Sequence, residues 1–382
     1  MRLPLALALL AAAWPAFAAT PPAQPKQGPG GADYPAEAVT KRAVGSVGAP
    51  TYVFHAAGPA SAPRPVVVFL HAWGATNPIV YGGWLEHLAR RGFLVLYPRY
   101  QEINRTRPAD ATGLAAGMLK DAFAALANDP DAKPDLNRVV FVGHLAGAAV
   151  AANLAALAGA EGLPKPKLVL AMMPGGIASD AKSRGIPLAD LSQIDPGTLF
   201  VTVIGDREHL PSDRLAKRLH REATSVPQNR KLFVRAPSDD HGFPTLAATL
   251  TAPGGVKDGY DAALLKPPAD PPRDPKARPP AFRWSADMAL TGDQTRLNAQ
   301  LQAATADTLD YLAFWKTLDM AAEAAFAGRT AEALRDMPDF VDMGRWSDGW
   351  PVRRLGAELP RLDAPAPQAA PAQAPPGPRR RL

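Results

Sequence analysis

A five-residue pattern near the middle of the chain, Gly143-His144-Leu145-Ala146-Gly147, has the spacing of the Gly-x-Ser-x-Gly turn that carries a nucleophilic serine. Four apolar residues precede the pattern and a run of small residues follows it, which predicts a buried strand, a sharp turn and a helix. Position 145, where the serine oxygen would stand, is a leucine. Because leucine has neither an acidic proton nor a lone pair, it cannot attack a carbonyl carbon. The pattern therefore predicts the setting of nucleophilic catalysis without its nucleophile.

The elements around this turn alternate between apolar strands and amphipathic helices. This alternation predicts an α/β protein with a mostly parallel central sheet and helices on both faces. A further strand is expected early in the chain, over residues 51–55. The six stretches expected to form buried parallel strands are residues 65–70, 94–97, 139–142, 168–171, 199–204 and 231–234.

The chain divides into one large domain with irregular flanks. Residues 20–48, rich in Pro, Gly and Ala, are expected to be a flexible lead-in, and 357–382 a disordered basic tail. A proline-rich stretch at 267–280 is expected to be a surface excursion. It is not a domain boundary, because the amphipathic helix expected at 307–326 needs a partner for its apolar face and should dock on the same sheet. The domain is therefore expected over residues 49–356.

The first nineteen residues resemble a secretory signal, with one basic residue, an apolar run and the small-residue site Ala16-Phe17-Ala18. We expect export to the periplasm or beyond, with no transmembrane anchor after signal cleavage. The chain has no cysteine, so disulfides and thiolate sites are excluded. Its net charge of +6 includes three arginines at the C-terminus, and no basic stripe suggests nucleic-acid binding. No metal or other cofactor is expected.

The order of these features resembles the α/β-hydrolase superfamily over about residues 51–248. The chain has a His-x-x-Gly loop after one strand, then the turn described above, an acidic loop and a loop containing Asp240-His241-Gly242. Stretches at 68–78, 97–101 and 344–349 are similar to a bacterial exported group in that superfamily, whose members are described as hydrolases of unknown substrate. The resemblance implies the α/β-hydrolase fold and an ancestry in ester or acyl hydrolysis.

The resemblance also implies roles for particular residues. Leu145 occupies the nucleophile position and His241 the position of the base. Glu208 occupies the position of the acid, with Asp206 as the alternative. The backbone N–H groups of Ala146 and of the region around Trp73 would form the oxyanion hole.

Three functions remain open. The first is a non-catalytic homologue that keeps its pocket for a small ester or acyl ligand. The second is an active ester hydrolase that uses a displaced hydroxyl or a water activated by His241. The third is a scaffold protein whose proline-rich tails matter more than the pocket. Each assignment of a catalytic role has an ordinary structural alternative. Asp206 or Glu208 would then be a solvated residue of a turn, and His241 an ordinary histidine of a surface loop. His144 is expected to pack beneath the turn without a catalytic role.

Overall fold

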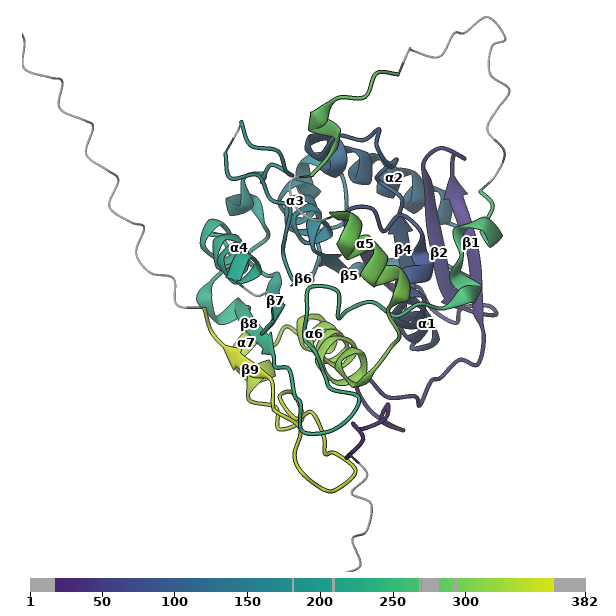
Figure 1. Cartoon of the computed structure of the whole chain (residues 1–382). Helices are drawn as coiled ribbons and strands as arrows, with labels where there is room; N and C mark the ends of the chain where they lie inside the picture. Colours follow the sequence, from purple (N-terminus) through teal and green to yellow (C-terminus); the bar gives the residue numbers. More distant parts are fainter. Residues whose placement is uncertain are drawn as a thin grey trace, which may run out of the picture.

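The strands of the chain form one nine-stranded sheet in the order β1-β2-β4-β3-β5-β6-β7-β8-β9 (Figure 1). The computed structural model describes residues 18–180, 182–207, 210–267, 269, 282–290 and 294–360. Strands β3 to β8 run parallel, and β1, β2 and β9 are antiparallel additions at the two edges. The strands are β1 Val39–Gly45, β2 Pro50–Ala56, β3 Arg64–Leu70, β4 Leu94–Pro98, β5 Pro134–His144, β6 Leu168–Met172, β7 Leu199–Gly205, β8 Lys231–Ala236 and β9 Gly356–Glu358. This mostly parallel sheet, with a strand–turn–helix at its centre, confirms the predicted α/β-hydrolase fold.

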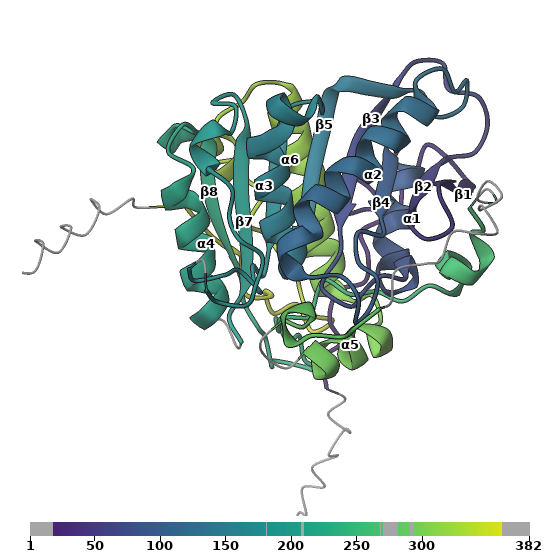
Figure 2. The same cartoon turned by 90° about the horizontal axis from the view of Figure 1, so that it is seen from above.

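Helices cover both faces of the sheet, as Figure 2 shows. One face packs against α1 and α6, and the other against α2 and α3. Side chains along β3 and β5 alternate between these two cores, since successive residues of a strand point to opposite faces. The helices are α1 Gly82–Arg90, α2 Ala111–Leu126, α3 Ala146–Glu161, α4 Leu210–Glu222, α5 Gln294–Ala303, α6 Lys316–Phe326 and α7 Ala331–Arg335.

The segment expected to be a flexible lead-in is built into the fold, which corrects that prediction. Strand β1 pairs with β2 along its whole length. Residues 19–36, here called the N-terminal strap, bind several distant elements. The Thr20 N–H donates to the Ser347 hydroxyl at 2.9 Å, and the Phe243 N–H donates to the Ala19 carbonyl at 2.8 Å. Composition predicted flexibility because proline and glycine disfavour helices and strands, but an irregular segment can be fixed by tertiary contacts alone.

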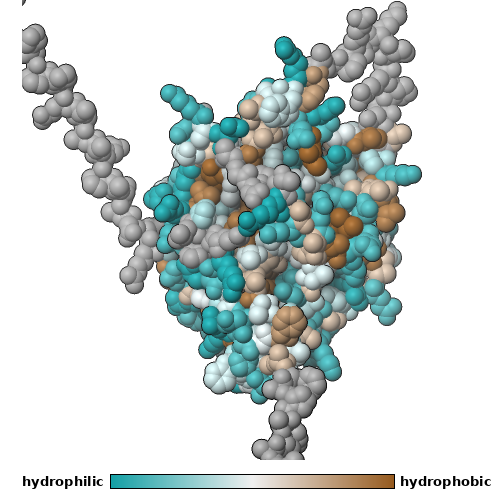
Figure 3. All heavy atoms as spheres, in the orientation of Figure 1, coloured by the Kyte–Doolittle hydropathy of each residue, from teal (hydrophilic) through white to brown (hydrophobic). Residues whose placement is uncertain are grey.

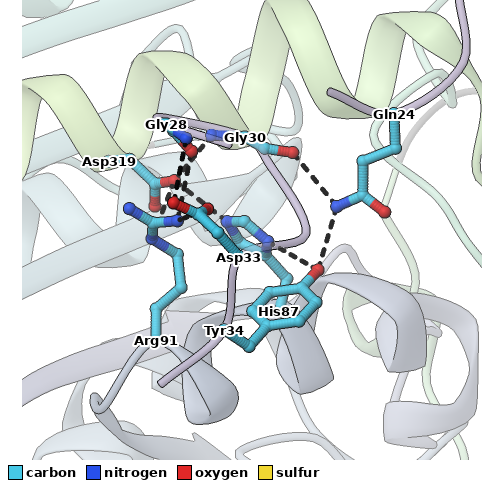
Figure 4. Close-up of polar contacts among 8 residues, drawn as sticks. All are labelled: Gln24, Gly28, Gly30, Asp33, Tyr34, His87, Arg91 and Asp319. Carbon is cyan, nitrogen blue, oxygen red and sulfur yellow. Dashed lines mark hydrogen bonds and ion pairs between the residues drawn. The ribbon is translucent and has the colours of Figure 1, made fainter. Parts of the chain in front are cut away.

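A buried polar cluster holds the strap against α1 and α6 (Figure 4). The Asp319 carboxylate accepts hydrogen bonds from the Gly30 N–H at 2.8 Å and from Nε2 of His87 at 3.0 Å. Nε of Arg91 lies 3.3 Å from the same oxygen. On the other side of the imidazole, the Tyr34 hydroxyl lies 3.1 Å from Nδ1 of His87. The cluster therefore joins three segments that are far apart in the sequence.

The C-terminal part of the chain packs on the sheet as the amphipathic pattern predicts. A π-helical turn, Asp310–Trp315, runs directly into α6, whose apolar side joins the core on the α1 face. Strand β9 then pairs with β8, so order extends two residues beyond the predicted end of the domain, Gly356. The predicted signal peptide, except for its last two residues, most of the proline-rich excursion and residues 361–382 of the tail lie outside the described residues.

Candidate functional site

The turn after β5 has the backbone of a nucleophile elbow. Leu145 has φ 51° and ψ −115°, a conformation that costs a leucine on the order of 1–3 kcal/mol. The flanking glycines allow this geometry. A Cβ on Gly143 would lie 2.1 Å from the Gly147 carbonyl oxygen, and a Cβ on Gly147 would lie 2.0 Å from that of Leu70. Only glycine fits at either position, so the close approach of strand and helix is preserved although the serine is absent.

The Leu145 side chain fills the elbow as part of the core. It is 6% exposed and packs among the apolar residues on the α1 face of the sheet. Its backbone is also fixed, because its N–H donates to the Met172 carbonyl at 3.0 Å and its carbonyl accepts from the Gly175 N–H at 3.2 Å. The strained turn is therefore held by its neighbours and does not depend on the side chain at position 145.

The loop after β3, residues 71–77, is held in place by buried side chains. Burial lowers the pKa of His71 to about 4, so this histidine is neutral, and its ring stacks on Tyr100 at 4.2 Å between centroids. Four backbone groups of the loop are bound by side chains: the His71 carbonyl by the Tyr100 hydroxyl, the Ala72 N–H by the Tyr81 oxygen, the Gly74 N–H by Oε1 of Gln101 and the Ala75 carbonyl by the Tyr97 hydroxyl. The loop is thus rigid before any ligand arrives.

The backbone donors of this region that have no acceptor within the described part of the chain include the N–H groups of Trp73 and Ala146. The register of the sheet relates them: Leu70 on β3 is paired with Gly143 on β5, and each donor lies three residues beyond its strand partner. Ala146 is also the first residue of α3, where an N–H has no acceptor within the helix. These are the two donors that the sequence predicted for an oxyanion hole.

His144 connects three loops at this end of the sheet. Its Nε2 lies 2.8 Å from the Leu250 carbonyl and therefore donates, which leaves Nδ1 to accept from the Tyr81 hydroxyl at 2.8 Å. Burial lowers the pKa of His144 to about 4 and raises the pKa of Tyr81, so both groups are neutral. His144 packs beneath the turn with its hydrogen bonds satisfied, as expected of a structural residue. The contact also brings Leu250, in the loop after β8, next to the elbow.

His241 lies on a projecting part of the same loop. A bridge between Asp239 and Leu246 closes the base of this projection, and His241 lies within it. Its Nε2 lies 2.7 Å from Oδ2 of Asp348, and its ring stacks on Trp350 at 5.5 Å. The carboxylate beside the predicted base thus comes from the C-terminal segment. It does not come from the loop after β7, where the sequence placed it.

The two predicted acids are placed differently. The Asp206 carboxylate accepts a hydrogen bond from the Ser238 hydroxyl at 2.5 Å, and that hydroxyl accepts one from the Ala248 N–H at 2.9 Å. Asp206 therefore fixes the base of the β8 loop and is not the partner of His241. Glu208 lies outside the described residues, and its pairing with His241 stays a prediction.

A segment from the C-terminal half covers the elbow region. Leu290 packs on Gly176, where a Cβ would also meet the Ala146 side chain at 3.4 Å. Helix α5, drawn in front of the sheet in Figure 1, places the Asn298 amide against Gly74, whose Cβ would lie 1.9 Å from Nδ2. The face that carries α5 is mixed, with apolar atoms in small separate groups (Figure 3). The segment therefore covers Gly176, which lies against Ala146, and Gly74, which follows Trp73 in the chain. These are the neighbours of the two predicted oxyanion donors.

The described residues contain no group of three or more His, Asp or Glu side chains that could hold a metal ion. Within the same residues, no helix has the length and apolar character needed to cross a membrane.

Residues that the sequence did not indicate hold the site together. Tyr81, Tyr97 and Tyr100 bind the loop after β3, yet in sequence they resemble ordinary core aromatics. Asp348 lies in one of the stretches that carried the family resemblance, at residues 344–349, but nothing in the pattern linked it to His241.

Comparison with known protein families gives one match, to the chlorophyllase family over residues 36–173. This range includes the loop after β3, the elbow and β6. It is less than half of the chain, and it ends before the loops that carry Asp206 and His241. No curated protein is detectably similar in sequence.

Solved structures similar to the chain include several hydrolases. A protein of Klebsiella pneumoniae assigned as a dienelactone hydrolase is 17% identical and aligns over 54% of this chain and 89% of its own, with a TM-score of 0.38. An esterase of Pyrobaculum calidifontis is 16% identical over 54% of this chain and 77% of its own, with a TM-score of 0.36. Carboxyl esterase 2 of Tuber melanosporum is 14% identical over 54% and 78%, with a TM-score of 0.40.

Proposed function

We propose that this chain, an α/β hydrolase by fold, binds a carbonyl-bearing ester or acyl ligand at the elbow without hydrolysing it. The observation that carries the proposal is the intact elbow backbone around Leu145, at φ 51° and ψ −115°. Acyl transfer in this fold needs an oxygen that a histidine can deprotonate. A leucine at that point removes the reaction but leaves the geometry that recognises a carbonyl group.

Binding is supported by the N–H groups of Trp73 and Ala146, which have no acceptor among the described residues. Backbone donors do not depend on the side chain at position 145, and the loop that carries Trp73 is fixed by buried tyrosines. Such preorganised donors stabilise negative charge on an oxygen, and they can also donate hydrogen bonds to the oxygen of an unreacted carbonyl.

The absence of hydrolysis is supported by the position of His241. Its ring is bound to Asp348, on the part of the loop that projects from the Asp239–Leu246 bridge. The same loop contacts the residue next to Leu145 through Leu250, whose carbonyl accepts the hydrogen bond from His144. The predicted base is thus paired on another part of the loop, so the proposal does not rest on the missing nucleophile alone.

The alternative is an active hydrolase with a displaced nucleophile. One hydroxyl, that of Ser238, is a specific candidate for that nucleophile. Ser238 is 5% exposed and donates to the Asp206 carboxylate, which is the only arrangement of serine and predicted acid that the described residues contain. Its partner is a carboxylate and not an imidazole, so it lacks the usual general base.

Covalent labelling with a fluorophosphonate and turnover of p-nitrophenyl butyrate test the proposal. We expect neither with the natural sequence. Labelling located at Ser238, and lost in Ser238→Ala, would establish the displaced-nucleophile alternative and overturn the proposal.

Two variants at the elbow form a matched pair. Leu145→Ser and Leu145→Ala open nearly the same space, and only the first adds a hydroxyl. We expect both to remain unlabelled, because His241 is engaged elsewhere. Labelling at residue 145 in Leu145→Ser alone would mean that a base still reaches the elbow and that the leucine is the single lesion.

Export is the second part of the proposal, and it is supported by the apolar run and the Ala16-Phe17-Ala18 site. Expression of the full chain in a bacterial host, followed by N-terminal sequencing of the periplasmic fraction, tests it. We expect a mature protein that begins at Ala19 or Thr20, directly after the Ala16-Phe17-Ala18 site. Recovery of the uncleaved chain from the cytosol would contradict export and leave the binding proposal unaffected.

A further inference from the structure

Arg99 is a charged residue in the stretch 97–101 whose side chain has no partner. Three of its neighbours in that stretch, Tyr97, Tyr100 and Gln101, bind the loop after β3. The Arg99 guanidinium donates no hydrogen bond and forms no ion pair within the described residues. The structural role of the stretch therefore does not account for this arginine.

The absence of a partner is unusual for an arginine at this depth. Arg99 is half-buried, and a guanidinium that is partly removed from water normally has an acceptor. Every other half-buried arginine in the described part of the chain binds a carboxylate or donates to a backbone carbonyl. None of the Arg99 nitrogens is among the buried polar atoms that lack a partner, so a ligand can reach them. Arg99 thus presents an accessible cation with nothing bound to it inside the chain.

Arg99 lines a pocket of about 370 Å³ beside the paired strands β2 and β4 (Figure 1). The other walls come from the turn between β1 and β2, the loop after β3 and residues 262–267. Hydrogen bonds join these walls. The Arg99 N–H donates to the Pro50 carbonyl at 3.0 Å, and Oδ1 of Asn77 accepts from the Ala262 N–H at 3.0 Å. The pocket is therefore shaped before any ligand binds.

A second unused donor, the Tyr52 hydroxyl, lines the same pocket. Tyr52 on β2 is paired with Tyr97 on β4, and Arg99 lies two residues beyond Tyr97, so the two side chains leave the same face of the sheet. The hydroxyl makes no hydrogen bond within the described residues, yet it is not among their fully buried unpaired atoms. Burial raises the pKa of Tyr52, which keeps the phenol protonated as a donor.

The charge in the pocket has one sign. Arg99 is the only charged residue of the lining, which contains neither Asp nor Glu. The carboxylate of Asp261, next to the lining in sequence, is already bound. Its Oδ1 accepts from Nδ2 of Asn77 at 3.0 Å and from the Ala263 N–H at 2.9 Å. The pocket is therefore suited to a ligand with a single negative charge.

The remaining walls favour a ligand that also carries carbon. Most of them are apolar, formed by Val47, Pro50, Ala262, Ala263 and Pro267. A carboxylate accepts two parallel hydrogen bonds from a guanidinium, and a short alkyl chain attached to it would cover these walls. Inorganic phosphate has no such chain and carries more charge than one arginine balances.

We propose that this pocket, here called the Arg99 pocket, binds a short-chain aliphatic monocarboxylate. The carboxylate is held by the Arg99 guanidinium and the Tyr52 hydroxyl, and the alkyl chain lies along the apolar walls. No elbow residue lines the pocket, so this binding site is separate from the one in the proposed function and does not rest on it.

Ligand-observed NMR titration of the full chain tests the proposal with three probes. These are butyrate, butyramide, which has the same size and no charge, and inorganic phosphate. We expect butyrate to bind about tenfold more tightly than either of the others, because only butyrate offers both the charge and the chain. Equal affinity for butyrate and butyramide, tighter binding of phosphate, or no binding of butyrate would overturn the proposal.

Charge-matched variants locate the binding. Arg99→Gln should weaken butyrate about tenfold, because it removes the guanidinium and keeps most of the side-chain length. Arg214→Gln, at an exposed position on α4, makes the same change in net charge and should leave the affinity unchanged. Butyrate binding that persists in Arg99→Gln, or that falls equally in Arg214→Gln, would also overturn the proposal.

Two milder variants keep the test decisive if Arg99→Gln does not fold. Arg99→Lys retains the charge without the planar fork, and Tyr52→Phe removes only the hydroxyl. We expect each to weaken butyrate severalfold and to leave butyramide unchanged. Unaltered butyrate affinity in both variants would contradict the assigned roles.

The outcomes are distinct from those for the elbow. Turnover of p-nitrophenyl butyrate would overturn the proposed function and leave the Arg99 pocket standing. A chain that neither turns over this ester nor binds butyrate would refute the Arg99 pocket alone.

Discussion

Two histidine–carboxylate pairs join distant parts of this chain, and they differ in their surroundings. In the pair of His87 and Asp319 both side chains are buried, and the carboxylate also receives the Gly30 N–H. In the pair of His241 and Asp348 the side chains are 30% and 48% exposed. The nitrogen–oxygen distances are similar, at 3.0 and 2.7 Å. The same two residue types therefore form a surface contact in one place and, in the other, part of the buried polar cluster of Gly30, Tyr34, His87, Arg91 and Asp319. This cluster is here called the clasp.

The comparison also shows what such a pair does not imply. The buried pair even has a hydroxyl in line with it, that of Tyr34, as in nucleophilic catalysis. That hydroxyl also accepts from Nε2 of Gln24 at 2.9 Å, and burial raises the pKa of Tyr34, so no phenolate forms near neutral pH. The exposed pair has no hydroxyl partner among the described residues. A histidine–aspartate pair indicates catalysis only together with a reactive oxygen.

The largest expected effect comes from breaking the buried clasp. Asp319→Ala should lower the free energy of unfolding by about 3–5 kcal/mol, because it leaves several buried donors without an acceptor. Urea unfolding followed by tryptophan fluorescence measures the loss. A loss below about 1 kcal/mol would mean that the strap contributes little to stability.

Acid should destabilise the fold through histidines outside both pairs. Burial lowers the pKa of His71 and His144 to about 4 and that of His220 to about 3, each from an ordinary 6.5. Between pH 6.5 and about 4 the unfolded chain therefore binds more protons, so stability falls as the pH falls. The slope is at most about 1.4 kcal/mol per pH unit for each histidine. Urea midpoints at pH 7.5, 6 and 5 measure it, and a flat profile would contradict these pKa values.

Removing one hydroxyl from the clasp should have a smaller effect. Tyr34→Phe keeps the ring, over which the Arg90 guanidinium lies at 4.1 Å, and removes the oxygen between His87 and Gln24. We expect a loss of about 1–2 kcal/mol, since two hydrogen bonds disappear at a partly buried position. Urea unfolding beside the wild-type chain measures the difference. If Tyr34→Phe were as damaging as Asp319→Ala, the phenol rather than the carboxylate would be the centre of the clasp.

The smallest effect is expected at the exposed pair. Asp348→Asn should change the free energy of unfolding by less than about 1 kcal/mol, because solvent screens a surface ion pair. The measurement is repeated in 0.5 M NaCl, where the difference should shrink further. A loss comparable to that of Asp319→Ala would remove the contrast between the two pairs.

The parts of this fold that sequence predicted are those governed by local patterns. The apolar run and the two glycines around Leu145 predict β5, the turn and α3, since only glycine fits on either side of the turn. The parallel strands likewise follow from their continuous apolar runs.

The parts that sequence did not predict depend on contacts between distant residues. Asp348 and His241 are separated by 107 positions, and both lie in irregular loops, where no periodicity indicates a neighbour. The strap was taken for a flexible segment because its composition lacks helical or strand patterns, although its backbone groups are bound by side chains from α6 and the C-terminal segment. The loops that complete the site could not be placed for the same reason.

The clasp also has a consequence for the order in which the molecule is completed. The Gly30–Asp319 contact spans 289 residues, and the Thr20–Ser347 contact spans 327. At a synthesis rate of about 5–20 residues per second, a ribosome needs roughly 15–60 s to make the acceptor on α6 after the strap has emerged. During that time the strap can contact α1, through pairs such as Tyr34 and His87, but it lacks its partners on α6 and in the C-terminal segment. The segment that is made first is therefore among the last to complete its contacts, and the groups that bind Asp319 and Ser347 remain unpaired while the rest of the sheet is being made.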